Sequence, residues 1–314
     1  MLHQRQMKGP LFYAKILLFG EYGIIKDSKG LAIPYNAYRG ALKSSQDLMG
    51  VSKRSNENLH LFYEYLVSLE TPLVSFNLNG FKKDLLNGMY FDSSIPQGYG
   101  VGSSGALVAS IYDKYADDKI TVLENLTREK LLKLKQIFSL MESFFHGKSS
   151  VLDPLNSYLS LPILINSNEN IEPAGIPSQK EGKGAVFLLD SEQTGETEPM
   201  VSIFMNKMKN EGFRKMISED FSTITDACID DFLHGNVTSL FGNVKSLSKI
   251  VLKNFKPMIP DAFHKVWEQG IQSNAYYLKL CGSGGGGYIL GFTEDYKKTQ
   301  KILKDHKLEL VYRF

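Results

Sequence analysis

The chain has 314 residues, of which 43% are hydrophobic and 22% are charged, and its formal net charge is +2. This length allows two domains with a substantial core, and the near-neutral charge argues against an extended nucleic-acid-binding surface. Two cysteines, Cys228 and Cys281, are too few for a disulfide scaffold and form no Cys-x-x-Cys motif. We expect a cytoplasmic protein without membrane spans, because the sequence shows neither a signal-peptide pattern nor an apolar run of about 18 residues.

The hydrophobic pattern of the first half predicts a mixture of strands and helices. We expect strands at residues 10–25, 32–43 and 88–95, and helices at residues 58–69, 105–116 and 128–145. The last helix should bury one face, because its apolar residues recur every three or four positions from Leu131 to Phe145. Residues 166–184 are rich in Asn, Pro and Gly and indicate a loop or a domain junction.

The second half is predicted to begin with a strand at residues 185–191 and to be mostly helical through residue 253. A helix with proline at its start should cover residues 259–274. Residues 276–292 should form a strand, a glycine turn and a second strand. Strands and helices that do not alternate strictly predict an α+β fold in two parts, which we expect at residues 1–180 and 181–314.

The stretch "PQGYGVGSSGALVAS" places Gly98, Gly100 and Gly102 before Ser103, Ser104 and a helical run. The unpaired N–H groups of a helix N-terminus attract phosphate, and glycines let the backbone approach its oxygen atoms. A serine hydroxyl in the first turn could cap the helix or ligate a phosphate-bound Mg²⁺. No Gly-Lys-Ser/Thr follows, so the stretch is not a Walker A loop. Glycine content alone leaves a plain strand–turn–helix corner open.

A second glycine run occupies Gly284–Gly287 and formally completes a G-x-G-x-x-G pattern with Gly282. The dinucleotide fingerprint needs a helix directly after its glycines, whereas Tyr288 begins a predicted strand, which excludes that interpretation. A hairpin turn, close backbone packing against another element, and a functional loop all remain open.

Two carboxylates flank the turn in "MESFFHGKSSVLDPLNSY". Glu142 shares the apolar stripe of its helix, where charged residues seldom lie without a partner or a metal. Asp153 follows the turn. One carboxylate could hold Mg²⁺ while the other orients a nucleophilic hydroxyl. Alternatively, Glu142 lies at the edge of the stripe and Asp153 caps a helix.

Lys15 is the only charged residue in "LFYAKILLFG". A lysine within a half-buried strand needs a partner or a route to solvent. It could pair with a carboxylate and a phosphate, or lie on the polar face of the strand. Glu21 and Tyr22, directly after Gly20, could form a turn or line a pocket.

Together these segments resemble the GHMP kinase superfamily, which includes galactokinase, homoserine kinase, mevalonate kinase and phosphomevalonate kinase, and within it most closely the mevalonate kinases. A strand that ends in Gly-Glu-His is matched by "KILLFGEYGII". The motif Pro-x-Gly-x-Gly-Leu-Gly-Ser-Ser is matched by "PQGYGVGSSGA", and a later glycine-rich loop by "LCGSGGGGYILGF". "HGKSSVLD" is similar to the His-Gly-x-Pro-Ser-Gly-x-Asp segment of mevalonate kinases, without its proline and second glycine.

The resemblance implies a two-domain α+β fold, with an N-terminal domain like domain 2 of ribosomal protein S5 and a ferredoxin-like C-terminal domain. It implies that Ser104 and Glu142 bind Mg²⁺, that Asp153 assists deprotonation of the substrate hydroxyl, and that Lys15 pairs with Asp153. Glu21 and Tyr22 would contact the substrate. The residues implied to bind ATP are Gly98, Tyr99, Gly100, Val101, Gly102, Ser103, Ser104, Gly284, Gly285 and Gly286.

The activity implied is transfer of the γ-phosphoryl group of ATP to the hydroxyl of mevalonate, for isoprenoid precursor synthesis, with Mg²⁺ as cofactor. The expected partner is this small alcohol, with no nucleic acid or membrane involved, and a homodimer is left open. Tyr22 replaces the family histidine and is more typical of bacterial phosphomevalonate kinases. The alternatives are phosphomevalonate kinase, with Lys26, Lys29 and Arg39 as candidate ligands of the substrate phosphate, another GHMP kinase, or a non-catalytic sensor of ATP and a metabolite.

Overall fold

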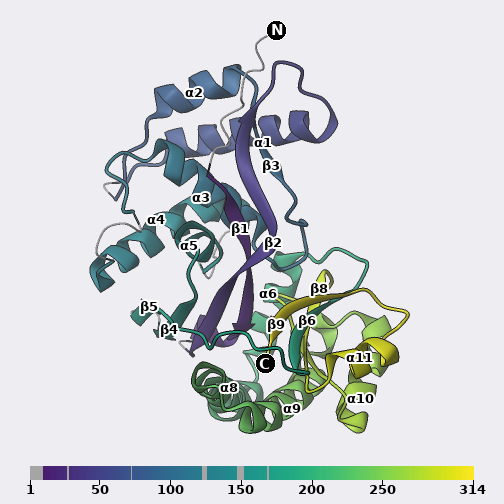
Figure 1. Cartoon of the computed structure of the whole chain (residues 1–314). Coiled ribbons are helices and arrows are strands. Elements are labelled where there is room, and N and C mark those ends of the chain that lie inside the picture. The colour runs from purple at the N-terminus through teal and green to yellow at the C-terminus, as the bar shows by residue number, and fades with distance from the viewer. Residues whose placement is uncertain (1–9, 27, 72, 122–125, 147–151, 168–169) are drawn as a thin grey trace. The chain divides into compact units, whose positions relative to one another are not determined.

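The computed structural model describes the whole chain except residues 1–9, 27, 72, 122–125, 147–151 and 168–169 (Figure 1). The chain divides into two compact units, and neither is continuous in sequence. Unit 1 holds the chain up to Ala14 together with Asn36–Ile95 and Gly102–Ser160. Unit 2 holds Lys15–Tyr35, Pro96–Val101 and Leu161–Phe314. The domain boundary expected at residue 180 stays a prediction.

Unit 1 is mainly helical. The elements that lie wholly within it are α1 (Gly50–Ser68), α2 (Leu78–Leu86), β3 (Met89–Ser93), α3 (Ser103–Tyr115), α4 (Arg128–His146) and α5 (Leu152–Leu159). Helix α3 is apolar on most of its surface and packs closely against α5. Helix α4 buries the stripe predicted from its spacing, including Leu134 and Phe138. The core of unit 1 therefore fixes the first turns of α3 and α5 against each other.

One sheet is built around the long strand β2 (Gly30–Ser44), which neighbours β1 (Phe12–Phe19). Strand β2 pairs antiparallel with β3, with Gly40 opposite Ser93, and with β4 (Ile163–Ser167), with Gly30 opposite Ile165. Strand β5 (Asn170–Pro173) pairs antiparallel with β4. Strand β1 is buried along nearly its whole length, as its continuous apolar sequence requires.

Unit 2 contains a second antiparallel sheet in the order β7-β8-β6-β9. Strand β6 lies inside this sheet and is almost wholly buried, and helix α9 packs against β7 and β8. The strands are β6 (Ala185–Asp190), β7 (Tyr277–Leu280), β8 (Tyr288–Thr293) and β9 (Leu308–Arg313). The helices are α6 (Thr197–Lys207), α7 (Glu211–Lys215), α8 (Ser222–His234), α9 (Val237–Asn254), α10 (His264–Ser273) and α11 (Tyr296–Ile302). Short helical segments lie at Gly23–Lys26, Met216–Phe221, Lys256–Met258 and Asp261–Phe263.

The α+β class is confirmed, and most predicted elements appear with shifted ends. The prediction of a loop over residues 166–184 is wrong at its start, because β4 and β5 form a short hairpin in which Ile165 lies opposite Ile171. Helix α1 begins earlier than predicted. The sequence did not reveal its first turns, because they are polar and carry little hydrophobic periodicity. Helix α2 was not predicted from the sequence.

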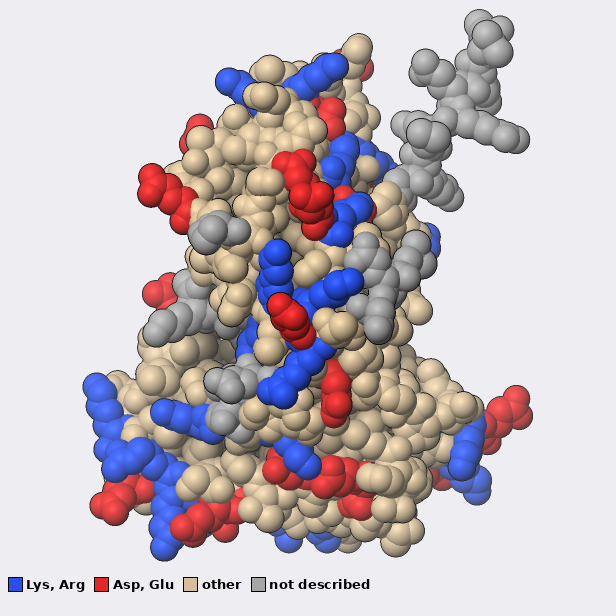
Figure 2. All heavy atoms as spheres, turned by 90° about the vertical axis from the view of Figure 1, so that its left-hand side faces the viewer, with Lys and Arg blue, Asp and Glu red and all other residues tan. Residues whose placement is uncertain are grey.

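No helix in the described part of the chain is both long enough and apolar enough to span a bilayer. The face shown in Figure 2 carries Lys and Arg side chains interspersed with Asp and Glu side chains. Both cysteines are buried and form no disulfide.

Candidate active site

The first glycine loop has the backbone conformation that only glycine adopts easily. Gly98, Gly100 and Gly102 have φ values of 75°, 76° and 81°. A Cβ atom on Gly100 would lie 2.4 Å from the carbonyl oxygen of Cys281. Gly102 is the N-cap of α3 and passes the chain directly into its first turn. The N–H groups of that turn have no acceptor within the helix, as at any helix start, and such groups are able to bind phosphate.

Val101 shows how this loop is anchored. Its side chain is fully buried, and its carbonyl oxygen accepts a 3.0 Å hydrogen bond from the backbone N–H of Lys15 in β1. The loop backbone, rather than the Val101 side chain, is therefore the part that can face a phosphate.

The second glycine loop packs backbone to backbone against the first, within unit 2. A Cβ on Gly287 would lie 2.4 Å from the Cα of Tyr99, and the N–H of Tyr288 donates to the carbonyl oxygen of Tyr99 over 3.3 Å. A Cβ on Gly284 would lie 2.5 Å from the carbonyl oxygen of Met258. Close backbone packing, one of the interpretations left open by the sequence, thus explains the glycine run. Contact of Gly284, Gly285 and Gly286 with a nucleotide stays a prediction.

A third segment, between β6 and α6, joins the two glycine loops. The N–H of Gly195 donates to the carbonyl oxygen of Gly98 over 2.8 Å, and the N–H of Gly287 donates to the carbonyl oxygen of Gln193 over 2.6 Å. A Cβ on Gly286 would lie 2.6 Å from the carbonyl of Thr194. Sequence reasoning missed this segment, because its polar sequence "SEQTG" is typical of any loop.

Three predicted site residues come together in unit 1. The Ser104 hydroxyl lies 3.5 Å from Oε1 of Glu142. Asp153 lies in the first turn of α5, and α3 approaches that turn so closely that a Cβ on Gly105 would lie 2.5 Å from the carbonyl carbon of Asp153. Glu142 is only 1% exposed, so its side chain points into the interior of the unit. Residues 147–151, where the sequence predicts a turn between the two carboxylates, lie outside the described residues.

The oxygen atoms of Ser104 and Glu142 fit the ligand preference of Mg²⁺. The described residues contain no group of three or more His, Cys, Asp or Glu side chains arranged around a metal position. A cation here would complete its coordination with phosphate oxygens and water, which is the usual arrangement for Mg²⁺ at nucleotide sites.

Lys15, Glu21 and Tyr22 lie in unit 2, and all three are buried. Burial raises the pKa of the Glu21 carboxyl overall, although Lys279 and, to a smaller extent, Lys15 lower it. Glu21 forms an ion pair with Lys279 of β7, at 2.5 Å from Oε1 to Nζ. The cavity beside this pair measures about 10 Å³, which is the room for one water molecule and not for an organic substrate. Glu21 therefore presents little surface to a substrate.

Tyr22 connects the end of β1 to the second glycine loop. Its hydroxyl donates a 2.6 Å hydrogen bond to the carbonyl oxygen of Ser283, and its ring packs against Phe204 and Phe255. Its backbone has φ of 62°, which is strained for a residue with a side chain. Burial, and secondarily the Glu21 carboxylate, raise the pKa of Tyr22. The hydroxyl is therefore held protonated as a donor.

Lys279 is the charged residue that sequence reasoning missed. It is 3% exposed, and its ammonium also donates to the carbonyl oxygens of Leu280 and Leu17 over 2.8 and 3.5 Å. The signal was available, because Lys279 is the only charge in the apolar strand "YYLKLC", as Lys15 is in its own. Lys15 belongs to unit 2 and Asp153 to unit 1, so their pairing stays a prediction.

Comparison with known proteins gives matches at the level of three-dimensional structure. No family model and no curated protein sequence matches this chain. Mevalonate kinase of L. major, solved with R-mevalonate, is 15% identical, with a TM-score of 0.64 over 97% of this chain and 93% of the other. Phosphomevalonate kinase of Streptococcus pneumoniae, solved with phosphomevalonate and AMPPNP, is 14% identical, with a TM-score of 0.63 over 96% and 99%.

A galactokinase from Lactococcus lactis, solved with galactose, matches to a similar degree. It is 11% identical, and its TM-score is 0.64 over 98% of this chain and 94% of the other. The likeness to each of these three structures covers nearly the whole chain, and it concerns the fold of the backbone.

Proposed function

Because the chain has the fold of the GHMP kinases, we propose that it is an ATP-dependent kinase of a small alcohol, and that the alcohol is mevalonate. One observation carries the proposal: Ser104, Glu142 and the first turn of α5 with Asp153 converge at the helix start that follows the first glycine loop. The sequence motifs that resemble mevalonate kinases contain the same residues.

The proposed reaction is an in-line transfer. The substrate hydroxyl oxygen forms a bond to the γ-phosphorus, the bond from that phosphorus to the β–γ bridging oxygen breaks, and ADP leaves with the electron pair. Such a transfer depends mainly on alignment and on neutralisation of charge. The backbone of Gly98–Gly102 and the first N–H groups of α3 would hold the phosphates. Asp153 would orient the hydroxyl and accept its proton, and Lys15 would contact Asp153 and the γ-phosphate.

Mg²⁺ would neutralise phosphate charge when bound. Ser104 and Glu142 are the residues that would hold it. Glu142 is buried, and a charge in a low-dielectric interior acts more strongly on a nearby cation than the same charge in water.

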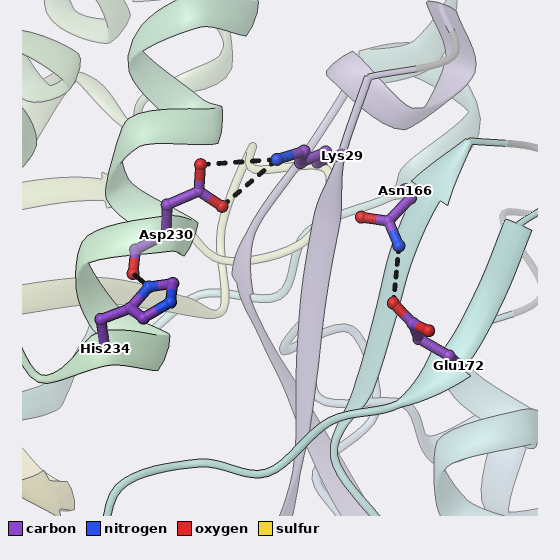
Figure 3. Close-up of polar contacts among 5 residues, drawn as sticks. All are labelled: Lys29, Asn166, Glu172, Asp230 and His234. Atoms are coloured by element: carbon purple, nitrogen blue, oxygen red, sulfur yellow. Dashed lines mark hydrogen bonds and ion pairs between the residues drawn. The ribbon is translucent and has the colours of Figure 1, made fainter.

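The ion pair of Lys29 favours an unphosphorylated acceptor over phosphomevalonate. A phosphorylated substrate would need cationic side chains that are not already neutralised. Lys29 forms an ion pair with Asp230 of α8, at 3.2 Å, so its charge is already compensated within unit 2 (Figure 3). Lys26 and Arg39 are exposed and stay candidates for binding a substrate phosphate. A sensor without catalysis would have no use for Lys15, Glu142 and Asp153 together, which favours an enzyme.

The proposal is tested by the release of ADP from ATP and Mg²⁺ with mevalonate, phosphomevalonate, galactose and homoserine as acceptors. We expect mevalonate to give the highest kcat/KM. A clear preference for phosphomevalonate would replace the acceptor and leave the kinase assignment intact. Binding of ATP without transfer to any acceptor would favour the sensor.

A further inference from the structure

The buried ion pair between Glu21 and Lys279 lies directly beside the end of β1, the strand that carries Lys15. Glu21 is 6% exposed and Lys279 is 3% exposed. The Lys279 ammonium also donates to the carbonyl oxygen of Leu17, two residues after Lys15 in the same strand. Lys279 therefore connects β7 to the end of β1 through both a charge and a backbone contact.

Two buried lysines thus lie near one buried carboxylate. Lys279 makes the direct contact with Glu21 and has the larger effect on its charge, and Lys15 has a smaller one. A buried carboxylate must be neutralised by some partner, because an uncompensated charge in the interior is strongly unfavourable. Lys15, from the neighbouring strand β1 of the same unit, is the other cation that acts on Glu21.

We propose that Lys279 is a positioning residue for phosphoryl transfer, which keeps Glu21 neutralised so that the ammonium of Lys15 is directed at the phosphate and not at Glu21. The inference rests on the function proposed above. It assigns Lys279 no contact with the substrate: Lys279 acts through Glu21 and Lys15. It also gives Glu21 a role in charge balance at a position where its side chain is nearly closed to a substrate.

The test compares Lys279→Met, Glu21→Gln and the double variant Lys279→Met/Glu21→Gln, with ADP release measured at saturating acceptor. In Lys279→Met, Glu21 should attract Lys15, and kcat should fall by about 100-fold, as for other small misplacements of a catalytic group. The KM for ATP should stay unchanged, because the glycine loops are not altered. The double variant removes both charges and should recover at least about tenfold in kcat, or about 1.4 kcal/mol of barrier.

The recovery separates positioning from structural support. If Lys279 only holds β7 against β1, the double variant should be no more active than Lys279→Met, and that result would overturn the proposal. So would a folded Lys279→Met with a normal kcat. If Lys279→Met does not fold, the kcat of the double variant is compared with that of Lys279→Arg, which keeps the charge at this position. Lys43→Met, which breaks the exposed Lys43–Asp92 pair of unit 1, is the matched control and should behave as the wild type.

The wild-type protein distinguishes failure of this inference from failure of the proposed function. If it transfers phosphate to none of the four acceptors, the kinase proposal fails, and the role of Lys279 fails with it. If it is active and the double variant shows no recovery, only the role of Lys279 is wrong. Unfolding of the same four proteins then reports the strength of the Glu21–Lys279 pair independently of activity.

Discussion

At the scale of single residues, Asp153 is the side chain whose chemistry the proposed reaction needs most directly. Asp153→Ala should lower kcat by about 10²–10⁴-fold, the usual contribution of a positioned acid or base. Nucleotide binding should persist, because the glycine loop and Ser104 are unchanged. ADP release and a titration with a nucleotide analogue measure the two effects. Glu129→Ala, an exposed acid in the first turn of α4, is the control and should be fully active. Normal turnover in Asp153→Ala would remove this residue from the mechanism.

Glu142 should show its role through magnesium. Glu142→Gln keeps the size of the side chain and the contact with Ser104 but removes the charge that would attract Mg²⁺. We expect the Mg²⁺ concentration for half-maximal activity to rise by at least about tenfold, with activity partly restored at high Mg²⁺. An unchanged magnesium dependence would assign Glu142 to the helix core.

Single residues also show what the sequence predicts well. Glu142 and Lys15 were identified because a charge within an apolar segment needs a reason, and both are buried in the structure. Lys279 carries the same signal but was missed, because its partner Glu21 is distant in sequence. A local pattern shows that a charge is unusual, whereas the three-dimensional structure is needed to show what neutralises it.

At the scale of elements, the contact between the glycine loops should be measurable as stability. Gly100→Ala puts a side chain at φ of 76° and places its Cβ 2.4 Å from the carbonyl oxygen of Cys281. Gly235→Ala puts one at φ of 70° with no atom within 4 Å. Both variants carry the same kind of backbone strain, and only Gly100→Ala adds crowding. The free energy of unfolding should therefore fall by about 1–3 kcal/mol more in Gly100→Ala than in Gly235→Ala. If urea titrations show that the two variants lose the same free energy of unfolding, the loops are not in close contact.

A carboxylate on α2 should make the stability of unit 1 depend on pH. Burial alone would raise the pKa of Asp84, but hydrogen bonds from Lys114 and Tyr115 of α3 outweigh it and hold the pKa below 3.8. The stabilisation is therefore present above pH 3.8 and lost as the pH falls through the lower folded-state pKa. Asp84→Asn should cost less than about 1 kcal/mol at pH 7, because the pair is partly exposed.

This difference between Asp84→Asn and the wild type should narrow at pH 3, as followed by urea unfolding at both pH values. Glu57→Gln, which affects an exposed pair within α1, should change the unfolding free energy little at either pH. A difference that widened on acidification would contradict the lowered pKa.

The elements also mark the limit of prediction from sequence. The strand before the glycine stretch and the helix after it were predicted because each is a marked apolar run in the sequence. The hairpin of β4 and β5 was missed because short strands with polar residues look like a loop. The segment Gln193–Gly195 could not be recognised, because its importance lies in backbone contacts with loops that are distant in sequence.

At the scale of the whole molecule, ligand binding should appear as added stability. A nonhydrolysable ATP analogue with Mg²⁺, at about 100 times its Kd, should add about 2.7 kcal/mol to the free energy of unfolding if it binds only the folded chain. A thermal shift with and without Mg²⁺ measures this gain. At the same Mg²⁺ concentration, the magnesium-dependent part should be smaller in Glu142→Gln, while the part that persists without Mg²⁺ should remain. No gain with any nucleotide would contradict an ATP site.

The packing of the two glycine loops has a consequence for the cysteine that lies between them. Cys281 is 1% exposed, and its sulfur lies 3.9 Å from the carbonyl oxygen of Gly100. An alkylating reagent can reach this thiol only while the loops are apart. In a Cys228→Ser background, the rate of labelling therefore measures how often the two glycine loops separate. Bound nucleotide should slow the labelling of Cys281, because it would hold the two loops together.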